Sequence, residues 1–403
     1  MTWSVANSRR DLHLLALHSG VATLAWALSA AFSAVFLLRV GLAPAGIFLS
    51  FSAILILRFI LRPAVLIVAP VAGLRRTFII GAFLCALSYP ALALAQGIGF
   101  GLALFVVLSS AGQVFYCTCY HVFFVALGDG ARRGSQVGAF QALGTIAAVL
   151  GPAAGGLLLT NRGPWLTFAV AFAIALVAIL PLLRIAEPRI ARQSPQGAYA
   201  AARHGVKLYF CDGWIQMGLT SAWGIVLFQS LHQRYDSFGG TLSLAALAAA
   251  LGGMLLGRLI DKGHGRSAVW INAAVLGLIV VLRATTFGGA AAAVIIAVAT
   301  TMIGGFYLPS WMTAAYNEAR LAPCTFRFQF AAEGGWDAGG AAAGLIAAII
   351  CDIGLPVDVA VLLALPMVAA QAALLHRSYA DQATDLPDMR IVAAASIAAE
   401  RAR

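Results

Sequence analysis

The sequence predicts an all-α membrane protein of twelve transmembrane helices arranged as two pseudo-symmetric six-helix bundles. Three observations predict this class: composition, the length of the apolar runs, and the placement of the positive charges. Of 403 residues, 62% are hydrophobic and 10% are charged, and the mean hydropathy is +0.91. A soluble domain carries about 25% charged residues. Such a chain needs a bilayer as its solvent.

A helix needs about 20 apolar residues to cross the hydrocarbon core. Twelve runs approach this length: 13–37, 44–66, 77–97, 101–127, 137–159, 165–186, 208–231, 241–260, 268–287, 289–315, 328–351 and 356–375. The first run is longer than the apolar part of a signal peptide, so we expect an uncleaved first helix.

The positive charges predict orientation. The net charge is +11, but the basic residues lie in short loops between apolar runs, which argues against nucleic-acid binding. If the N-terminus is cytoplasmic, only Arg39, Arg162, Arg234 and Arg283 fall outside. This asymmetry predicts that both termini are cytoplasmic, in a bacterial inner membrane. The six cysteines show no disulfide framework and are expected to be buried apolar side chains.

A hydrophilic segment at 187–206 divides the chain. We predict a cytoplasmic N-terminus (1–12), a first bundle (13–186), this linker, a second bundle (207–376) and a cytoplasmic tail (377–403). Ala131-Arg132 after the fourth span and Ala319-Arg320 after the tenth support an internal repeat. Two halves related about an axis along the membrane normal are a common transporter plan.

Small residues recur in the fifth predicted span. Ala147, Gly151, Pro152, Gly155 and Gly156 follow Gly138 at helical spacing. Small residues let two helices approach closely, and proline removes a backbone donor and bends a helix. Ordinary helix packing explains the same pattern, so conformational control is one of two interpretations.

A second motif is the loop from Gly257 to Arg266, with Asp261 and several bases between them. An acid and bases at a helix end can make a charge contact that holds the two halves in one state, although a solvated turn has the same composition. The equivalent loop in the first half, Gly73-Leu74-Arg75-Arg76, has no acid.

These two motifs, with the six-plus-six division, resemble the major facilitator superfamily of transporters over the whole chain. The fifth-span run resembles the antiporter motif of its exporters, with Ala147 in place of one glycine, and the second motif resembles its cytoplasmic loop signature. The resemblance implies alternating access around a central cavity, no cofactor, and a small-molecule solute. We expect the protein to be a monomer. Besides the solute, its expected partners are the lipid bilayer and a proton as coupling ion. The fourth span has no arginine, unlike the drug exporters of that family, which argues against proton-coupled drug export.

Ionisable residues inside the membrane are functional candidates because they are costly there. Arg58 and Arg62 are four residues apart, on one face of the second span. They either contact an anionic solute or extend their charged ends to the membrane surface. His18 and His121 are further candidates, since histidine titrates near neutral pH.

The second half holds the acids. Glu333 and Asp337 are four residues apart on one face of the eleventh span, which suits proton coupling or a cationic ligand. The alternative is a structural pairing with Arg320 or Arg327. Asp212, one turn into the seventh span, is expected to pair with Lys207.

Cys117 and His121 share a helix face and are weak candidates for a soft metal such as copper. We expect a secondary transporter, and the first hypothesis is proton-coupled efflux of an organic anion or amphiphile. The alternatives are a copper importer, a membrane-embedded enzyme, and an assembly or sensor protein. No clustered catalytic set appears, so no enzyme is expected.

Overall fold

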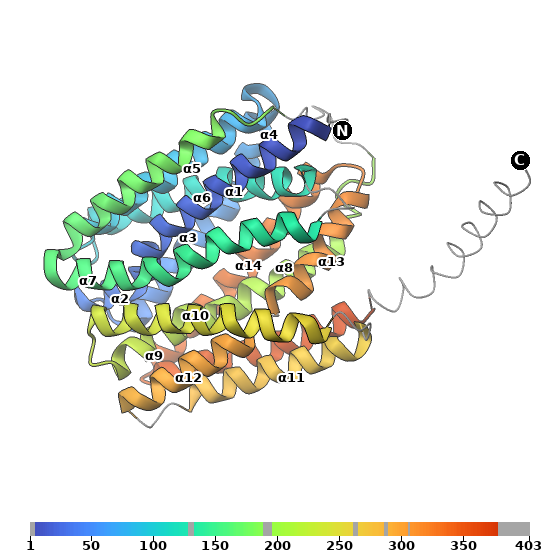
Figure 1. Ribbon diagram of the computed structural model, residues 1–403. Helices are drawn as coiled ribbons and strands as arrows, with labels where there is room; N and C mark the ends of the chain where they lie inside the picture. Colours follow the sequence, from blue (N-terminus) through green and yellow to red (C-terminus); the bar gives the residue numbers. More distant parts are fainter. Residues whose placement is uncertain are drawn as a thin grey trace, which may run out of the picture.

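The computed structural model describes residues 5–127, 133–187, 196–260, 265–285, 289–304 and 307–377. All regular secondary structure in these ranges is helical. Figure 1 shows long helices running roughly side by side, with the first part of the chain (blue to green) lying above the second part (yellow to orange). We call the end where α1 begins the amino-terminal end of the bundle, and the opposite end the far end.

The first part of the chain forms helices that are interrupted where the backbone loses hydrogen bonds. α3 ends next to Pro63, which lacks an N–H. Gly163, with φ +81°, interrupts α7 before Pro164, so α7 makes two passes. The elements are α1 (Val5–Leu28), η1 (Ala30–Phe32), α2 (Ser33–Arg39), α3 (Pro44–Leu61), α4 (Pro63–Ala72), α5 (Leu74–Ala93), α6 (Phe100–Leu127) and α7 (Arg133–Leu182).

The second part contains a π-helical turn and a further break, so several helices together make one pass. α8 and α9 are joined by the π-helix η2, and α12 and α13 follow each other closely. The elements are α8 (Arg203–Gln216), η2 (Met217–Ala222), α9 (Trp223–Ser230), α10 (Tyr235–Ile260), α11 (Gly265–Ala284), α12 (Gly289–Gly304), α13 (Tyr307–Leu321), α14 (Thr325–Asp352) and α15 (Val357–Leu362). The last apolar stretch continues to Arg377.

Seven stretches in the described residues are long and apolar enough to cross a membrane, and three shorter apolar helices accompany them. The number is smaller than twelve because several passes are interrupted, and because the described side chains cover only part of α10 and α11. Leu143–Leu182 contains two passes. The pair α8 and α9 together makes one pass, and the pair α12 and α13 together makes another. Counted in this way, the described segments make the twelve passes that the sequence predicts.

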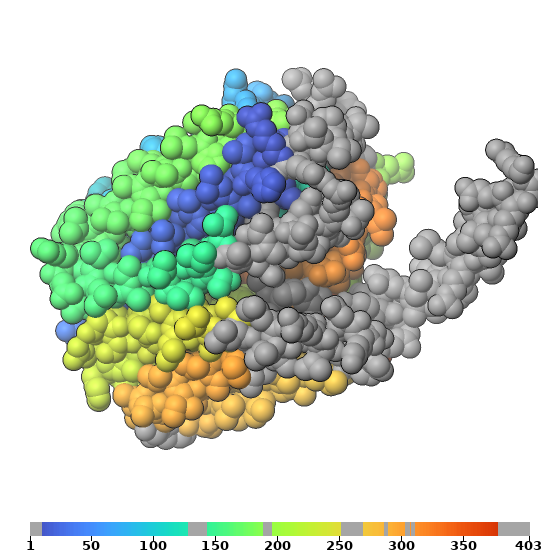
Figure 2. All heavy atoms as spheres, viewed as in Figure 1, coloured from blue at the N-terminus to red at the C-terminus, as the bar shows by residue number. Residues whose placement is uncertain are grey.

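The two parts of the chain meet along two helix pairs, α3 with α14 and α7 with α10. On the face in Figure 2, α7 and α10 lie directly against each other. Ser52 on α3 donates a hydrogen bond to the Ala341 carbonyl on α14. The Ala153 N–H on α7 donates to Ser243 Oγ on α10 at 2.9 Å.

The small residues of the fifth span serve two interfaces. A Cβ on Gly151 would meet Ala27, and one on Gly155 would meet Leu28 and Phe32, all in the first pass. A Cβ on Gly156 would instead meet the Tyr235 carbonyl on α10, and one on Gly239 would meet the Pro152 carbonyl. Backbone-to-backbone contact at the far end therefore depends on glycine at these positions.

The loop motif of the second half is only partly visible. Asp261 lies outside the described residues, and the described side chains do not include those of Gly257 and Arg266. α10 and α11 end and begin on either side of this loop, at Ile260 and Gly265. Of the predicted segments, 1–12 and 187–206 are described in part, and only the first residue of 377–403 is described. The domain boundaries stay predictions.

In the first half, the loop Gly73-Leu74-Arg75-Arg76 contains no acid, but Glu187 from another part of the chain contacts it. The Arg75 N–H donates to Glu187 Oε1 at 3.1 Å, and Arg75 Nε lies 3.7 Å from Glu187 Oε2. Glu187 follows the sixth pass, so it ties the end of this bundle to the start of α5. A carboxylate is favoured there because the first N–H groups of a helix lack partners.

Candidate functional site

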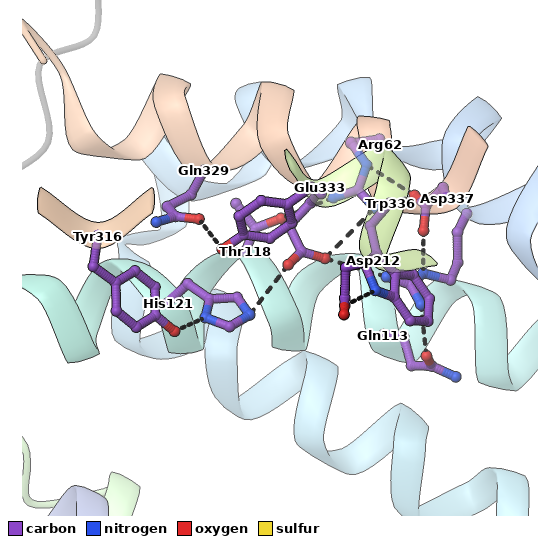
Figure 3. Close-up of polar contacts among 12 residues, drawn as sticks. Arg62, Gln113, Thr118, His121, Asp212, Tyr316, Gln329, Glu333, Trp336 and Asp337 are labelled. Atoms are coloured by element: carbon purple, nitrogen blue, oxygen red, sulfur yellow. Dashed lines mark hydrogen bonds and ion pairs between the residues drawn. The ribbon is translucent and has the colours of Figure 1, made fainter. Parts of the chain in front are cut away.

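Arg58 of α3, and Arg62 at the junction of α3 and α4, face two acids of α14 inside the bundle. Arg58 Nη2 lies 3.3 Å from Glu333 Oε2, and Arg58 Nε lies 3.0 Å from Asp337 Oδ1. Arg62 Nε donates to Asp337 Oδ2 at 3.1 Å, and its Nη2 contacts the same oxygen. These four residues are at most 4% exposed. Figure 3 shows Arg62 and Asp337 joined by dashed lines.

Helix geometry brings the two pairs together. Each pair has a spacing of four residues, so its members lie on one face, one turn apart. α3 and α14 pack against each other, and the side chains at Gly334 and Gly340 are only hydrogen atoms, which leaves room for Arg62 and Leu55. The result is a four-membered ion network across the two bundles.

α6 supplies neutral partners to the arginines. Gln113 Oε1 accepts a hydrogen bond from Arg58 at 2.8 Å, and Thr118 Oγ1 accepts one from Arg62 at 3.3 Å. Buried guanidinium groups are stable only when their N–H groups have acceptors. These contacts fix both arginines on the side of the first bundle.

His121 extends the network toward the amino-terminal end. Its Nε2 lies 3.1 Å from Glu333 Oε1, and its Nδ1 lies 2.6 Å from the Tyr316 hydroxyl on α13. The Tyr316 ring also packs on Phe124 of α6. Glu333 is therefore shared between His121 and the arginines. Figure 3 shows its contact with His121 as a dashed line.

Asp212 contacts Trp336, whose ring also contacts Arg58 of the ion network. The Trp336 indole N–H donates to Asp212 Oδ2 at 2.8 Å, and the Tyr307 hydroxyl donates to Oδ1 at 2.8 Å. The guanidinium carbon of Arg58 lies 5.1 Å from the centre of the Trp336 ring. Among the described residues, Asp212 is thus linked to the arginine network through the Trp336 side chain alone.

The structure brings six of the candidate residues together: Arg58, Arg62, His121, Asp212, Glu333 and Asp337. Their partners differ from some of the expected ones. The acids pair with Arg58 and Arg62 rather than with Arg320 or Arg327, and Asp212 accepts from Tyr307 and Trp336 rather than from Lys207. Both arginines are 2% exposed, so their charged ends do not reach the surface.

His18 lies apart from this network. Its Nδ1 is 2.7 Å from the Ala178 carbonyl and its Nε2 is 3.0 Å from the Tyr116 hydroxyl, among Phe78 and other rings of the first bundle. These contacts occupy both ring nitrogens. They are those of a histidine that packs the bundle.

The metal interpretation of Cys117 and His121 lacks support. Both nitrogens of His121 are already occupied by Glu333 and Tyr316. Among the described residues, no three histidine, cysteine or acidic side chains group closely enough to hold a metal ion.

The connecting residues Gln113, Thr118, Tyr316, Glu187 and Trp336 were not singled out from the sequence. The signal was present for Gln113 and Thr118. They are polar, lie five residues apart and fall inside a predicted membrane span, where polar side chains need hydrogen-bond partners.

A sequence model described as the Major Facilitator Superfamily matches residues 14–354. This match covers most of the chain. The chain belongs to the Major Facilitator Superfamily. The family consists of transporters, so the alternative of a membrane-embedded enzyme is excluded, and the chain is a multi-pass membrane transporter.

Solved structures of this superfamily share the fold. The Escherichia coli fucose:proton symporter is 16% identical with a TM-score of 0.63, over 91% of this chain and 98% of that one. The human organic anion transporter is 16% identical with a TM-score of 0.64, over 91% and 99%. A nucleoside transporter is 13% identical with a TM-score of 0.62, over 92% and 99%. No curated protein sequence matches this superfamily member.

Proposed function

We propose that this protein is a proton-linked secondary transporter of a small organic anion. The observation that carries the proposal is the pairing of Arg58 and Arg62 of one bundle with Glu333 and Asp337 of the other. Alternating access requires the two bundles to move relative to each other. Movement of α3 away from α14 would separate the two buried arginines from the two buried acids.

Breaking a buried pair in this way costs about 3–5 kcal/mol when one partner is left alone. The cost falls if the arginines and the acids each gain a new partner of opposite charge. A carboxylate or phosphate of the solute can take the place of the acids at the arginines, where it meets the same planar donor groups. A proton can neutralise the acid that is released. Anion and proton then bind in the same state.

The distances to the arginines support a different role for each of the two acids, Asp337 and Glu333. Asp337 accepts from Arg62 through two nitrogens and lies against Arg58. Glu333 holds the arginines only at 3.3 and 4.0 Å, and it also contacts His121. Glu333 is therefore the acid that exchanges its arginine for a proton, with His121 and Tyr316 completing the proton site.

Binding of anion and proton together predicts transport in the same direction, that is, symport. An inward proton gradient then drives uptake, which replaces the expectation of efflux. Two structural neighbours carry names with related chemistry, a fucose:proton symporter and an organic anion transporter. At 16% identity they support the fold, and the proposal rests on the charges of this chain.

We also propose that the amino-terminal end of the bundle faces the cytoplasm of a bacterium and that the protein acts as a monomer. The basic residues at that end, which include Arg75, Arg203 and Arg320, support the orientation.

The test is uptake into liposomes that contain the purified protein, with and without an inward proton gradient. The probes are benzoate, lactate, glucuronate and phosphate as anions, and fucose and uridine as neutral solutes. We expect gradient-driven uptake of at least one anion, lost in Arg58→Gln and Arg62→Gln but retained in Arg39→Gln, whose side chain is exposed. Uptake restricted to neutral solutes, or unchanged in both arginine variants, would contradict the proposal.

A further inference from the structure

Asp212 is a buried acid whose hydrogen-bond partners in the described part of the chain are all neutral. It is 4% exposed and accepts from Tyr307, Trp336 and, at 3.5 Å, Gln216. None of the ion pairs among the described residues includes Asp212. A buried carboxylate is stable with neutral donors alone only when these donors are well placed, and it is stable without charge when it holds a proton.

The charges around it do not balance. Arg58 and Arg62 bring two positive charges, whereas Glu333, Asp337 and Asp212 bring three potential negative charges. The cluster is neutral when one proton resides on an acid or on His121. An uncompensated charge in such a site is costly, so the cluster favours the state that holds this proton.

Trp336 connects Asp212 to the arginine network. Its N–H points at Asp212, and its ring lies under the Arg58 guanidinium. A hydrogen bond to a charged carboxylate is about twice as strong as one to a neutral acceptor. A proton on Asp212 therefore weakens the contact that holds the indole, and the indole is one of the surfaces that hold Arg58.

We propose that Asp212 is a second proton-binding group, separate from Glu333, and that Trp336 transmits its protonation to Arg58. The proposal deepens the proposed function, on which it rests for its role in transport. In this scheme, a proton on Asp212 releases the indole and loosens Arg58 from α14, which prepares Arg58 for the anion. The titratable groups around Asp212 are Tyr209 and Cys211 on α8, Tyr307 on α13 and Glu333 on α14.

The first experiment follows the proton directly and needs no solute. Infrared difference spectra of the protein in lipid, between about pH 5 and pH 8, report carboxyl groups that gain a proton in the range where perturbed acids titrate. We expect a protonated-carboxyl component that is absent in Asp212→Asn, moved in frequency in Asp212→Glu, and unchanged in Asp352→Asn, which removes an exposed acid of α14. A spectrum that is the same in all four proteins would overturn the assignment.

The second experiment tests the transmission. Cys117 lies on α6 between Gln113 and Thr118, the partners of Arg58 and Arg62. In a protein that keeps only this cysteine, the rate of alkylation by N-ethylmaleimide at one fixed pH reports how open the arginine network is. We expect Asp212→Asn, which mimics the protonated acid, to raise the rate about threefold or more, the size of a lost neutral hydrogen bond.

Trp336→Phe should remove this effect of Asp212→Asn, because the ring has lost its donor. Trp214→Phe is the matched control, since the Trp214 N–H donates to the Leu363 carbonyl instead. An equal effect of Asp212→Asn in the Trp336→Phe and Trp214→Phe backgrounds would overturn the transmission through Trp336. Both experiments are independent of solute transport. A failure to observe anion–proton symport would thus contradict the proposed function without deciding this inference.

Discussion

Arg62 and Asp337 are 275 residues apart in the sequence, yet they form a two-nitrogen contact in the interior between the two bundles. Asp337 is fully buried, and Arg62 stands at the junction of α3 and α4, just before Pro63. Because each residue belongs to a different bundle, their contact reports directly on the relative position of the bundles.

Removing one member of this pair should destabilise the protein. We expect Asp337→Asn to lower the free energy of unfolding by about 3–5 kcal/mol, because Arg62 keeps a buried charge without its acid. The measurement is thermal or denaturant unfolding in lipid or detergent. Arg62→Gln combined with Asp337→Asn should recover most of the loss. A double variant as unstable as the sum of the two single variants would contradict the pairing.

The glycines at the far end predict a conformational variant. Gly239→Ala would place a methyl group against the Pro152 carbonyl, so α10 must move away from α7. Gly240→Ala is the matched control, since a Cβ there meets nothing within 4 Å. Spin labels at Arg162 and Arg234, two exposed positions at this end, should show a longer distance in Gly239→Ala alone. The same distance distribution in both variants would show that the contact does not hold the far end closed.

Tyr316 is expected to tune the proton site through His121. Tyr316→Phe keeps the ring that packs on Phe124 but removes the hydroxyl that lies 2.6 Å from His121. The loss of a hydrogen bond worth about 1 kcal/mol predicts a fivefold lower rate of proton-linked uptake, with a changed pH profile. Tyr199→Phe, at an exposed tyrosine, is the control. An unchanged profile in Tyr316→Phe would exclude Tyr316 from the proton site.

A second pH effect is expected at the amino-terminal end, before the predicted seventh span. His204 Nδ1 lies 2.6 Å from Glu318 Oε1, and this hydrogen bond raises the pKa of His204 above 6.5, against the opposing effects of burial and Lys207. A raised pKa in the folded state stabilises the protein below the unfolded pKa, and the stabilisation is lost as the pH rises through the folded pKa. His204→Gln should therefore lower the melting temperature more at pH 6 than at pH 9. An equal loss at both values would contradict this assignment.

The sequence predicted the fold class because twelve apolar runs are a direct consequence of bilayer thickness. It also predicted which faces carry charge, since Arg58 and Arg62, or Glu333 and Asp337, share a face by spacing alone. It could not predict that these faces meet, because the contact joins distant helices of two bundles. The partner of Asp212 was misassigned to Lys207 for the same reason. Lys207 is near Asp212 in the sequence, whereas Trp336, the residue that donates to Asp212, lies on the distant helix α14.

The charge arrangement at Glu333 gives the central claim its sharpest test. Liposomes that contain the protein and a pH-sensitive dye inside should acidify when the transported anion is added outside, with about one proton per negative charge, since this ratio keeps the buried site neutral. Glu333→Gln should still exchange labelled anion for unlabelled anion but move no protons, whereas Asp352→Asn should behave as the wild type. Anion uptake without acidification in the wild type, or full acidification in Glu333→Gln, would contradict the account.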